Sequence, residues 1–416
     1  MDDRRYYGLD ALRGGMMMLG ILLHGATLYL ASPPPHMPIT TDRNTSYAMD
    51  VIFDLIHSFR MPTFFVLAGF FASLLVEKRG LWGTYKNRAA RIVAPLLAGM
   101  LTVLPLTMLF MVDFMLSAKY GTHDILPSRA DIERIEADAR AQGIPAGIFL
   151  GHLWFLYYLC YFYLLIPLCR FLVKSSAPFE ATIGRLLASP LALVFFALCT
   201  AAALWPYPGA QVLGEFLFLK PHVPTLIYYG LFFVFGYVFH FHRAFLQGLT
   251  RYVAWCAVLA LVLFPLSIYA TQLEYADPGH GAGLHLAVVM VHGLCTWTLI
   301  YLAIGCALRF FDYESPWILY VSQSSYWVYL IHLPVVALTA WWLVPYDLPA
   351  VLKFSIVVAV TALVCFVTYH YWVQNTWVSS FLNGRRFDLD WPWRVKLASA
   401  PAKLSPRQRG DDSSVT

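Results

Sequence analysis

The chain has 416 residues, of which 59% are hydrophobic and only 13% are charged. Soluble globular chains carry about 25% charged residues, so this composition excludes an ordinary soluble domain and indicates a polytopic membrane protein. The net charge of +5 comes largely from short loops and the C-terminal tail, which favours membrane topology over nucleic-acid binding as its explanation.

Apolar segments of about 20 residues, the length that crosses a bilayer as a helix, recur along the chain. We expect an all-α protein with about ten transmembrane helices, at residues 10–31, 50–76, 91–112, 149–173, 184–205, 225–242, 250–272, 285–308, 316–343 and 350–373. They make one transmembrane domain over residues 1–378, followed by a polar, disordered tail over residues 379–416. We expect no cleavable signal peptide, because the first apolar run is long enough to span the membrane.

Lys and Arg gather in the even-numbered loops between these segments and near both termini. Examples are Lys78 and Arg79 in the second loop, Arg243 and Arg251 flanking the sixth, and Arg385 in the tail. Short loops rich in Lys and Arg stay on the cytoplasmic side. The sequence therefore predicts that both termini are cytoplasmic.

The first expected span contains Arg13 and His24. Ionisable side chains at membrane depth are costly, so they usually face a protein interior and indicate function. Eleven residues are about three helical turns, which places both side chains on one face, about 16 Å apart along the axis. The pair predicts a site that reaches across part of the bilayer.

The second expected span contains His57 and Arg60, three residues apart and therefore on one helix face. Pro62 follows directly, and a proline within a helix frees a backbone carbonyl and can bend the helix. Arg60 is either part of a site or a structural charge partner.

Two further histidines lie in expected spans: His152, two residues before Trp154, and His332, six residues after Tyr326. Each is either a hydrogen-bonded structural histidine or part of one cavity shared with the first two spans. We expect His152, Trp154 and Tyr326 to contact substrate. No HxH or HExxH spacing among the membrane histidines supports a metal site, and none is expected.

Arg88 and Arg91 lie three apart at the start of the third expected span. Guanidinium groups stay charged and offer paired donors that suit phosphate. The pair predicts a site for a phosphate-bearing donor, with ordinary anchoring at the cytoplasmic surface as the alternative.

Together, the ten spans, Arg13 with His24, and the arginine pair resemble the membrane acyltransferase-3 family. Residues 53–61 (FDLIHSFRM) and 152–156 (HLWFL) are similar to its subgroup of osmoregulated periplasmic glucan succinyltransferases from Gram-negative bacteria. The resemblance covers about residues 5–375.

The resemblance implies a multi-pass enzyme of the bacterial inner membrane. It would transfer an acyl group, succinyl in this subgroup, from cytoplasmic acyl-coenzyme A (acyl-CoA) to a hydroxyl of a periplasmic glucan or related polysaccharide. Acyl-CoA is then a donor substrate, with no permanently bound cofactor. His24 matches the catalytic histidine, Arg13 belongs to the same signature, and Arg88 and Arg91 match the acyl-CoA side. Implied partners are the bilayer and a glucan synthase or export machinery, without nucleic acid.

The chemistry fits these residue types. A neutral imidazole at His24 can take the proton of a sugar hydroxyl as a general base. Arg60 can stabilise the oxyanion, or Arg60 or Arg13 can hold the terminal carboxylate of a succinyl donor. His57, His152 and His332 can orient the base or bind the sugar, or one of them can be the base in place of His24. An acyl-histidine intermediate is a variant of the same reaction.

Three other functions stay open on the sequence. The first is an O-acetyltransferase of another cell-surface glycan. The second is a proton-coupled secondary transporter, because intramembrane histidines and arginines also serve proton coupling and anion binding. The third is a scaffold subunit of a glucan export complex.

Overall fold

The computed structural model describes residues 6–35, 40–141, 148–174, 177–189, 191–214, 217–277, 279 and 281–393. Its helices in chain order are α1 (Tyr7–Thr27), α2 (Tyr47–Arg88), the π-helix η1 (Ala89–Val93), α3 (Ala94–Leu101), α4 (Val103–Tyr120), α5 (Arg129–Ala141), η2 (Gly151–Leu153), α6 (Trp154–Leu164), α7 (Ile166–Lys174), α8 (Ala177–Ala188), α9 (Leu191–Leu204), η3 (Pro208–Ala210), α10 (Val223–Phe239), α11 (Arg243–Gly248), η5 (Leu249–Arg251), α12 (Val253–Ala276), α13 (Ala282–Phe310), α14 (Pro316–Leu343), α15 (Ala350–Thr368), η6 (Tyr369–Val373) and α16 (Trp377–Asn383).

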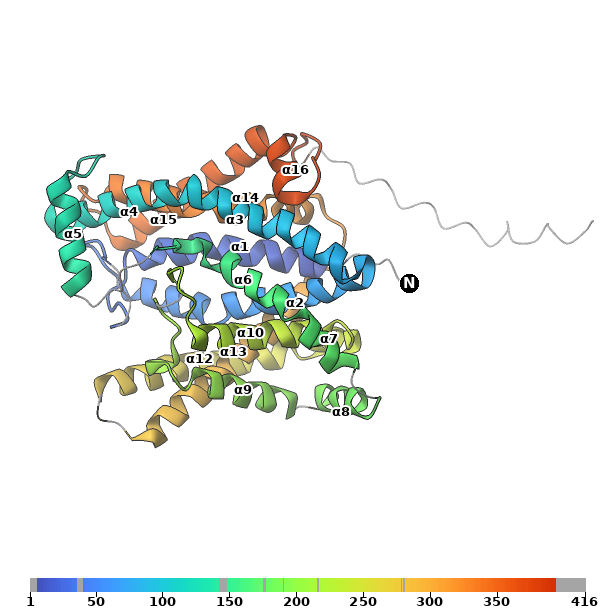
Figure 1. Ribbon diagram of the computed structural model, residues 1–416. Coiled ribbons are helices and arrows are strands. Elements are labelled where there is room, and N and C mark those ends of the chain that lie inside the picture. Colours follow the sequence, from blue (N-terminus) through green and yellow to red (C-terminus); the bar gives the residue numbers. More distant parts are fainter. Residues whose placement is uncertain are drawn as a thin grey trace, which may run out of the picture.

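The long helices run side by side along one direction (Figure 1). The surface helix α5 lies at one end of this bundle, and α8, α16 and the start of α1 lie at the other. We call these the α5 end and the N-terminal end. An isolated antiparallel bridge joins Phe149 to Phe218. The predicted all-α class is confirmed.

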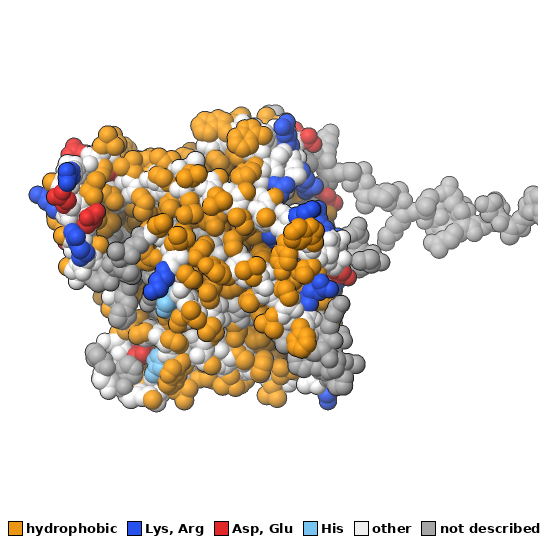
Figure 2. Space-filling view, in the orientation of Figure 1, with side chains coloured by type: hydrophobic (Ala, Val, Ile, Leu, Met, Phe, Trp, Pro, Cys, Tyr) orange, Lys and Arg blue, Asp and Glu red, His pale blue; other side chains and the backbone are white. Residues whose placement is uncertain are grey.

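Six helical stretches are long and apolar enough to cross a membrane, and a seventh qualifies if α10 and the bent α11–η5 segment form one span; this count covers the described residues. Figure 2 shows hydrophobic side chains over the middle of one face and most charged side chains towards its two ends. This surface is typical of a membrane protein. The count of ten spans stays a prediction.

Helix α1 lies inside the bundle and packs against α2, α13, α14 and α15. Glycines allow its close approach to two of them. A Cβ added at Gly8 would lie 2.7 Å from the Ala307 carbonyl oxygen on α13, and one at Gly14 would lie 2.9 Å from Val321 on α14. Small residues at helix interfaces let membrane helices pack at short distances. Helix α1, which is not among the six apolar stretches, is thus fixed by neighbours on several sides.

Helix α2 is interrupted at two points that matter for the site. Pro62 has no N–H, which frees the Ser58 carbonyl one turn earlier, and the Thr296 hydroxyl donates to that carbonyl at 3.0 Å. Farther on, Gly80 has φ +68° and kinks the helix. Residues before and after this kink can therefore face one space, as described below.

The loop between α1 and α2 is anchored by a buried ion pair. Lys353 Nζ on α15 donates to both carboxylate oxygens of Asp42 at 2.9 Å, and also reaches Asn44 Oδ1 at 3.3 Å. Both charged side chains are fully buried. This pair fixes the connection between the two helices that carry His24 and Arg60.

Replacing Lys353 with Met should destabilise the protein, because Asp42 is left as a buried charge without its partner. Breaking a buried pair in this way costs about 3–5 kcal/mol. The measurement is the thermal unfolding midpoint of the detergent-solubilised protein. The double variant Lys353→Met with Asp42→Leu should recover most of the loss. Equal midpoints for wild type and the single variant would contradict this account of the pair.

Candidate active site

Four side chains that the sequence singles out meet at one small chamber. His24 comes from α1, Arg60 from α2, His152 from η2 and His332 from α14. The chamber has a volume of about 20 Å³, which is room for about one water molecule. Its other lining residues are apolar or aromatic: Met17, Met61, Phe64, Trp154, Phe155 and Tyr329.

Two of the histidines are held in fixed tautomers by backbone carbonyls. His332 Nδ1 donates to the carbonyls of Val328 and Tyr329 at 3.0 and 2.8 Å, and His152 Nε2 donates to Leu330 at 3.0 Å. A carbonyl only accepts, so these ring nitrogens carry the protons. The second nitrogens, Nε2 of His332 and Nδ1 of His152, are buried and have no hydrogen-bond partner among the described residues. The site therefore presents two unused acceptors.

A proline in α14 provides the anchor for His152. Pro334 has no N–H, so the carbonyl of Leu330, four residues earlier, has no helical donor. That carbonyl accepts the hydrogen bond from His152. The broken helical ladder thus becomes a holder for a side chain from a distant part of the chain.

His24 completes the group of rings. Its centroid lies 5.2 Å from that of His332, which lies 5.4 Å from that of His152. The His24 ring makes no hydrogen bond to the described residues. The two unused acceptor nitrogens belong to rings that line the same chamber as His24. The arrangement is suited to receiving and moving a proton.

Arg60 supplies the positive charge of the chamber. It is 5% exposed, and its Nε donates to the Met16 carbonyl at 2.8 Å. Its guanidinium carbon lies 5.7 Å from the Phe64 ring centroid, within the range of a cation–π contact. No carboxylate of the described residues forms an ion pair with it. A buried, unpaired cation favours a bound anion or a developing negative charge.

The guanidinium of Arg60, which comes from α2, lies against Gly20 of α1. A Cβ added at Gly20 would lie 2.3 Å from Arg60 Nη2, so a larger residue there would displace the guanidinium. Arg13, Met17, Gly20 and His24 follow one another on one face of α1, with Gly20 about 6 Å from His24 along the axis. A group that enters beside Arg13 therefore reaches Arg60 before it reaches His24.

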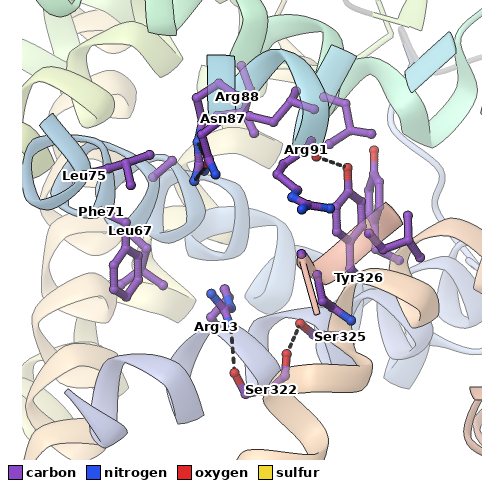
Figure 3. Close-up of a pocket in the computed structure, with 18 of the residues that line it drawn as sticks. Arg13, Leu67, Phe71, Leu75, Asn87, Arg88, Arg91, Ser322, Ser325 and Tyr326 are labelled. Atoms are coloured by element: carbon purple, nitrogen blue, oxygen red, sulfur yellow. Dashed lines mark hydrogen bonds between the residues drawn. The ribbon is translucent and has the colours of Figure 1, made fainter. Parts of the chain in front are cut away.

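A much larger cavity, of about 730 Å³, borders this chamber (Figure 3). The two share four lining residues: Met17, Phe64, Phe155 and Tyr329. Among the residues that the structure describes, six basic side chains and no acidic one line the large cavity. The six are Arg13, Lys78, Arg79, Arg88, Arg91 and Arg385. Such a lining is typical of a binding site for a polyanion. The kink at Gly80 lets residues on both sides of it contribute.

The arginines of this cavity have different local partners. Arg13 Nη2 donates to Ser322 Oγ at 2.7 Å and lies 3.4 Å from an Asp10 carboxylate oxygen. Arg88 Nη1 donates to the Tyr163 hydroxyl at 3.3 Å. In Figure 3, Arg13 and Arg88 lie across an open space.

Arg91 is tied more closely to the protein. Its Nη1 donates to the carbonyls of Ser380 and Phe381 in the last turn of α16. The Ser380 carbonyl also accepts from the Gly384 N–H at 3.1 Å. Its own carbonyl accepts from the Tyr326 hydroxyl at 2.7 Å. Arg91 therefore anchors α16 to the cavity wall.

The predicted site residues are thus divided between two spaces. The chamber takes His24, Arg60, His152, His332 and Trp154, and the large cavity takes Arg13, Arg88, Arg91 and Tyr326. His57 lines neither; its ring stacks on Phe53, with centroids 5.2 Å apart. The catalytic and binding roles of all these residues stay predictions.

Sequence reasoning missed several polar residues of the large cavity, namely Lys78, Arg79, Asn87, Ser322, Gln323, Asn383 and Arg385. In the sequence Lys78, Arg79 and Arg385 indicate only topology, although the place of the first two directly before Gly80 is a signal of a kink that can turn them towards a site. Within the described part of the chain, no three His, Cys, Asp or Glu side chains are grouped to hold a metal ion.

Comparison with known proteins identifies the family. The family described as "Acyltransferase domain" matches residues 6–370. "Glucans biosynthesis protein C" of Escherichia coli O139:H28 (strain E24377A / ETEC) is 26% identical over 346 residues, which cover 80% of this chain and 82% of that protein. The proteins of the same name from Salmonella heidelberg (strain SL476) and Salmonella typhi are each 25% identical over 338 residues, with the same coverage. No solved structure gives a significant match. The chain therefore belongs to the membrane acyltransferase-3 family and is an acyltransferase that transfers groups other than aminoacyl groups.

Proposed function

We propose that this chain transfers an acyl group, succinyl in the first instance, from acyl-CoA to a hydroxyl of a periplasmic glucan or related polysaccharide. The observation that carries the proposal is the cation-rich cavity, whose described lining contains no acidic residue and which borders a chamber of three histidines and an arginine. The relatives named Glucans biosynthesis protein C support a glucan as acceptor.

The large cavity has the character that an acyl-CoA donor needs. Phosphate groups would meet exposed cations such as Lys78 and Arg79, where paired and charge-assisted donors are available. The narrower, apolar arm of the donor would follow Met17, Phe64 and Phe155 towards the chamber. The thioester would then arrive where the two spaces share their wall.

The residues of the chamber can catalyse this transfer. The hydroxyl oxygen of the acceptor attacks the thioester carbon, and His24 takes its proton as general base. The C–S bond of the tetrahedral intermediate then breaks, and the leaving thiolate takes the proton from the His24 imidazolium. The ester and the free thiol of CoA are the products. The unused nitrogens of His152 and His332 would accept from His24 or the hydroxyl and orient them.

Arg60 would stabilise the oxyanion of that intermediate. It lies on the side of His24 from which the thioester arrives, and its guanidinium is already fixed by Met16 and Phe64. Donors that are fixed before the reaction need no reorganisation, which is why such groups lower barriers. Of the two roles open for Arg60 on the sequence, this position favours the oxyanion over the terminal carboxylate of the donor.

We further propose that the N-terminal end of the bundle faces the cytoplasm of the bacterial inner membrane. The large cavity lies towards this end, where acyl-CoA is present, and the loops rich in Lys and Arg favour the same orientation. The acceptor would then enter from the α5 end, supplied by a glucan synthase or export machinery.

Replacing His24 with Ala should lower acyl transfer by about 10²–10⁴-fold, the usual contribution of a general base. The measurement is mass spectrometry of periplasmic glucans from a strain that lacks its own acyltransferase and expresses the variant. CoA release by the purified protein with glucan gives the rate.

His242→Ala is the matched control, because His242 lies at the α10–α11 bend and lines neither space. The proposal for His24 fails if the His24 variant modifies glucan as fast as wild type at equal expression. The mass added by wild type identifies the acyl group.

Gly20→Ala should lower kcat by up to about 10²–10³-fold, the usual effect of removing one oxyanion donor. The added methyl group would displace the Arg60 guanidinium, whose Nη2 lies 2.3 Å from that Cβ position. The KM for the donor should change little, because the large cavity is untouched. Steady-state CoA release measures both constants.

Gly15→Ala on the same helix is the control, because its added Cβ would meet no neighbouring helix or side chain of the described residues within 4 Å. Equal kcat values for wild type and the Gly20 variant, with both folded, would rule out a positioning role for Gly20.

A further inference from the structure

The wall of the large cavity includes a segment near the end of the chain that neither the family signature nor the sequence motifs mark. Residues Asn383, Gly384, Arg385 and Phe387 line the cavity together with residues from α1, α2 and α14. We call residues 384–388, which follow α16, the C-terminal strap.

The strap is held in place from both of its ends. Gly384 ends α16 in the left-handed conformation, with φ +86°, and a Cβ there would lie 2.8 Å from Arg91 Nη2. The Arg385 carbonyl accepts from Ser379 Oγ at 2.9 Å. Farther along, the Phe387 N–H donates to the Gln374 carbonyl at 3.0 Å. The strap is therefore a built part of the cavity wall.

Two contacts hold α16 itself against the large cavity. Arg91 donates to the carbonyls of Ser380 and Phe381, as described above. Asn383 Nδ2 donates to the carbonyl of Gln323 on α14, another lining residue, at 3.2 Å. The position of the strap thus depends on the same arginine that the sequence assigns to the donor.

Two side chains of the strap line the cavity, the cation Arg385 and the aromatic ring of Phe387. The Arg385 guanidinium carbon lies 4.8 Å from the Phe387 ring centroid. Arg385 is exposed, and no carboxylate of the described residues forms an ion pair with it. A guanidinium held on an aromatic face keeps its edge donors available for phosphate.

The cavity changes character along its length. Its lining cations Lys78, Arg79 and Arg385 are exposed to solvent, whereas lining residues that it shares with the chamber, such as Met17 and Phe64, are buried and apolar. A donor that is polyanionic at one end and narrow and apolar at the other matches this order in only one direction.

We propose that Arg385 and Phe387 hold the phosphorylated nucleotide end of the donor, so that the C-terminal strap is part of the donor-binding site. This inference rests on the proposed acyl-CoA donor. Arg385 supplies a charge-assisted contact to phosphate, and Phe387 fixes the guanidinium. Chemistry in the chamber does not involve either residue.

The test measures binding of CoA itself, which does not react, by isothermal titration to the purified full-length protein. Arg385→Gln should raise the Kd by about tenfold or more, since a hydrogen bond to a charged group is lost. Arg386→Gln is the matched control, because Arg386 is the adjacent arginine and does not line the cavity. Phe387→Leu, which keeps the volume apolar but removes the ring face, should weaken binding less.

A second measurement uses an acyl-pantetheine thioester, a donor without the nucleotide. The KM for acyl-CoA should rise in the Arg385 variant, and the KM for acyl-pantetheine should stay unchanged. Equal CoA affinity in wild type and the Arg385 variant would overturn the inference, as would an equal rise in both KM values. If wild type binds no CoA at all, the proposed donor is wrong, and this inference falls with it.

Discussion

The seating of one guanidinium between two helices is the constraint on which the rest of the site depends. Arg60 is buried on α2, and its Nε is held by a carbonyl of α1. Gly20 on α1 leaves room for the guanidinium between the two helices. A buried cation without a carboxylate partner is costly, so the packing must fix it firmly. The buried Asp42–Lys353 pair, which anchors the loop between the two helices, is part of that framework.

Backbone groups left unpaired by prolines provide a second level of organisation. The carbonyls of Ser58 and Leu330 each lose a helical donor to a proline, and each is taken by a side chain from another helix. In a membrane interior, unsatisfied backbone groups are expensive, so these bonds stabilise the contacts between helices. At Leu330 the same bond also fixes which nitrogen of His152 faces the chamber. The hydrogen bond from His152 to Leu330 therefore stabilises helix packing and also orients a histidine of the site.

Much of the fold class and part of the site follow from local sequence. Helix geometry alone places Arg13 and His24 on one face, because their spacing is a property of a single helix. Proline positions predict which carbonyls are free, but not which donors take them: His152 is 178 residues from Leu330. Spacing within α2 could not separate His57 from Arg60, because neighbouring segments decide which of them reaches the chamber. Arg385 lies in a segment that composition alone reads as tail, so only the three-dimensional arrangement brings it to the cavity.

The small volume of the chamber affects how much of the acyl donor is lost to hydrolysis. A space that admits about one water molecule cannot hold a water and a sugar hydroxyl together. In the proposed reaction both are nucleophiles that His24 could activate, and water is present at far higher concentration. The thioester is then protected from hydrolysis only while the acceptor hydroxyl, and not water, fills the chamber. The acceptor must therefore expel the water before the donor carbonyl is in place. The order in which the two substrates arrive, rather than their intrinsic reactivity, would decide between productive transfer and wasted donor.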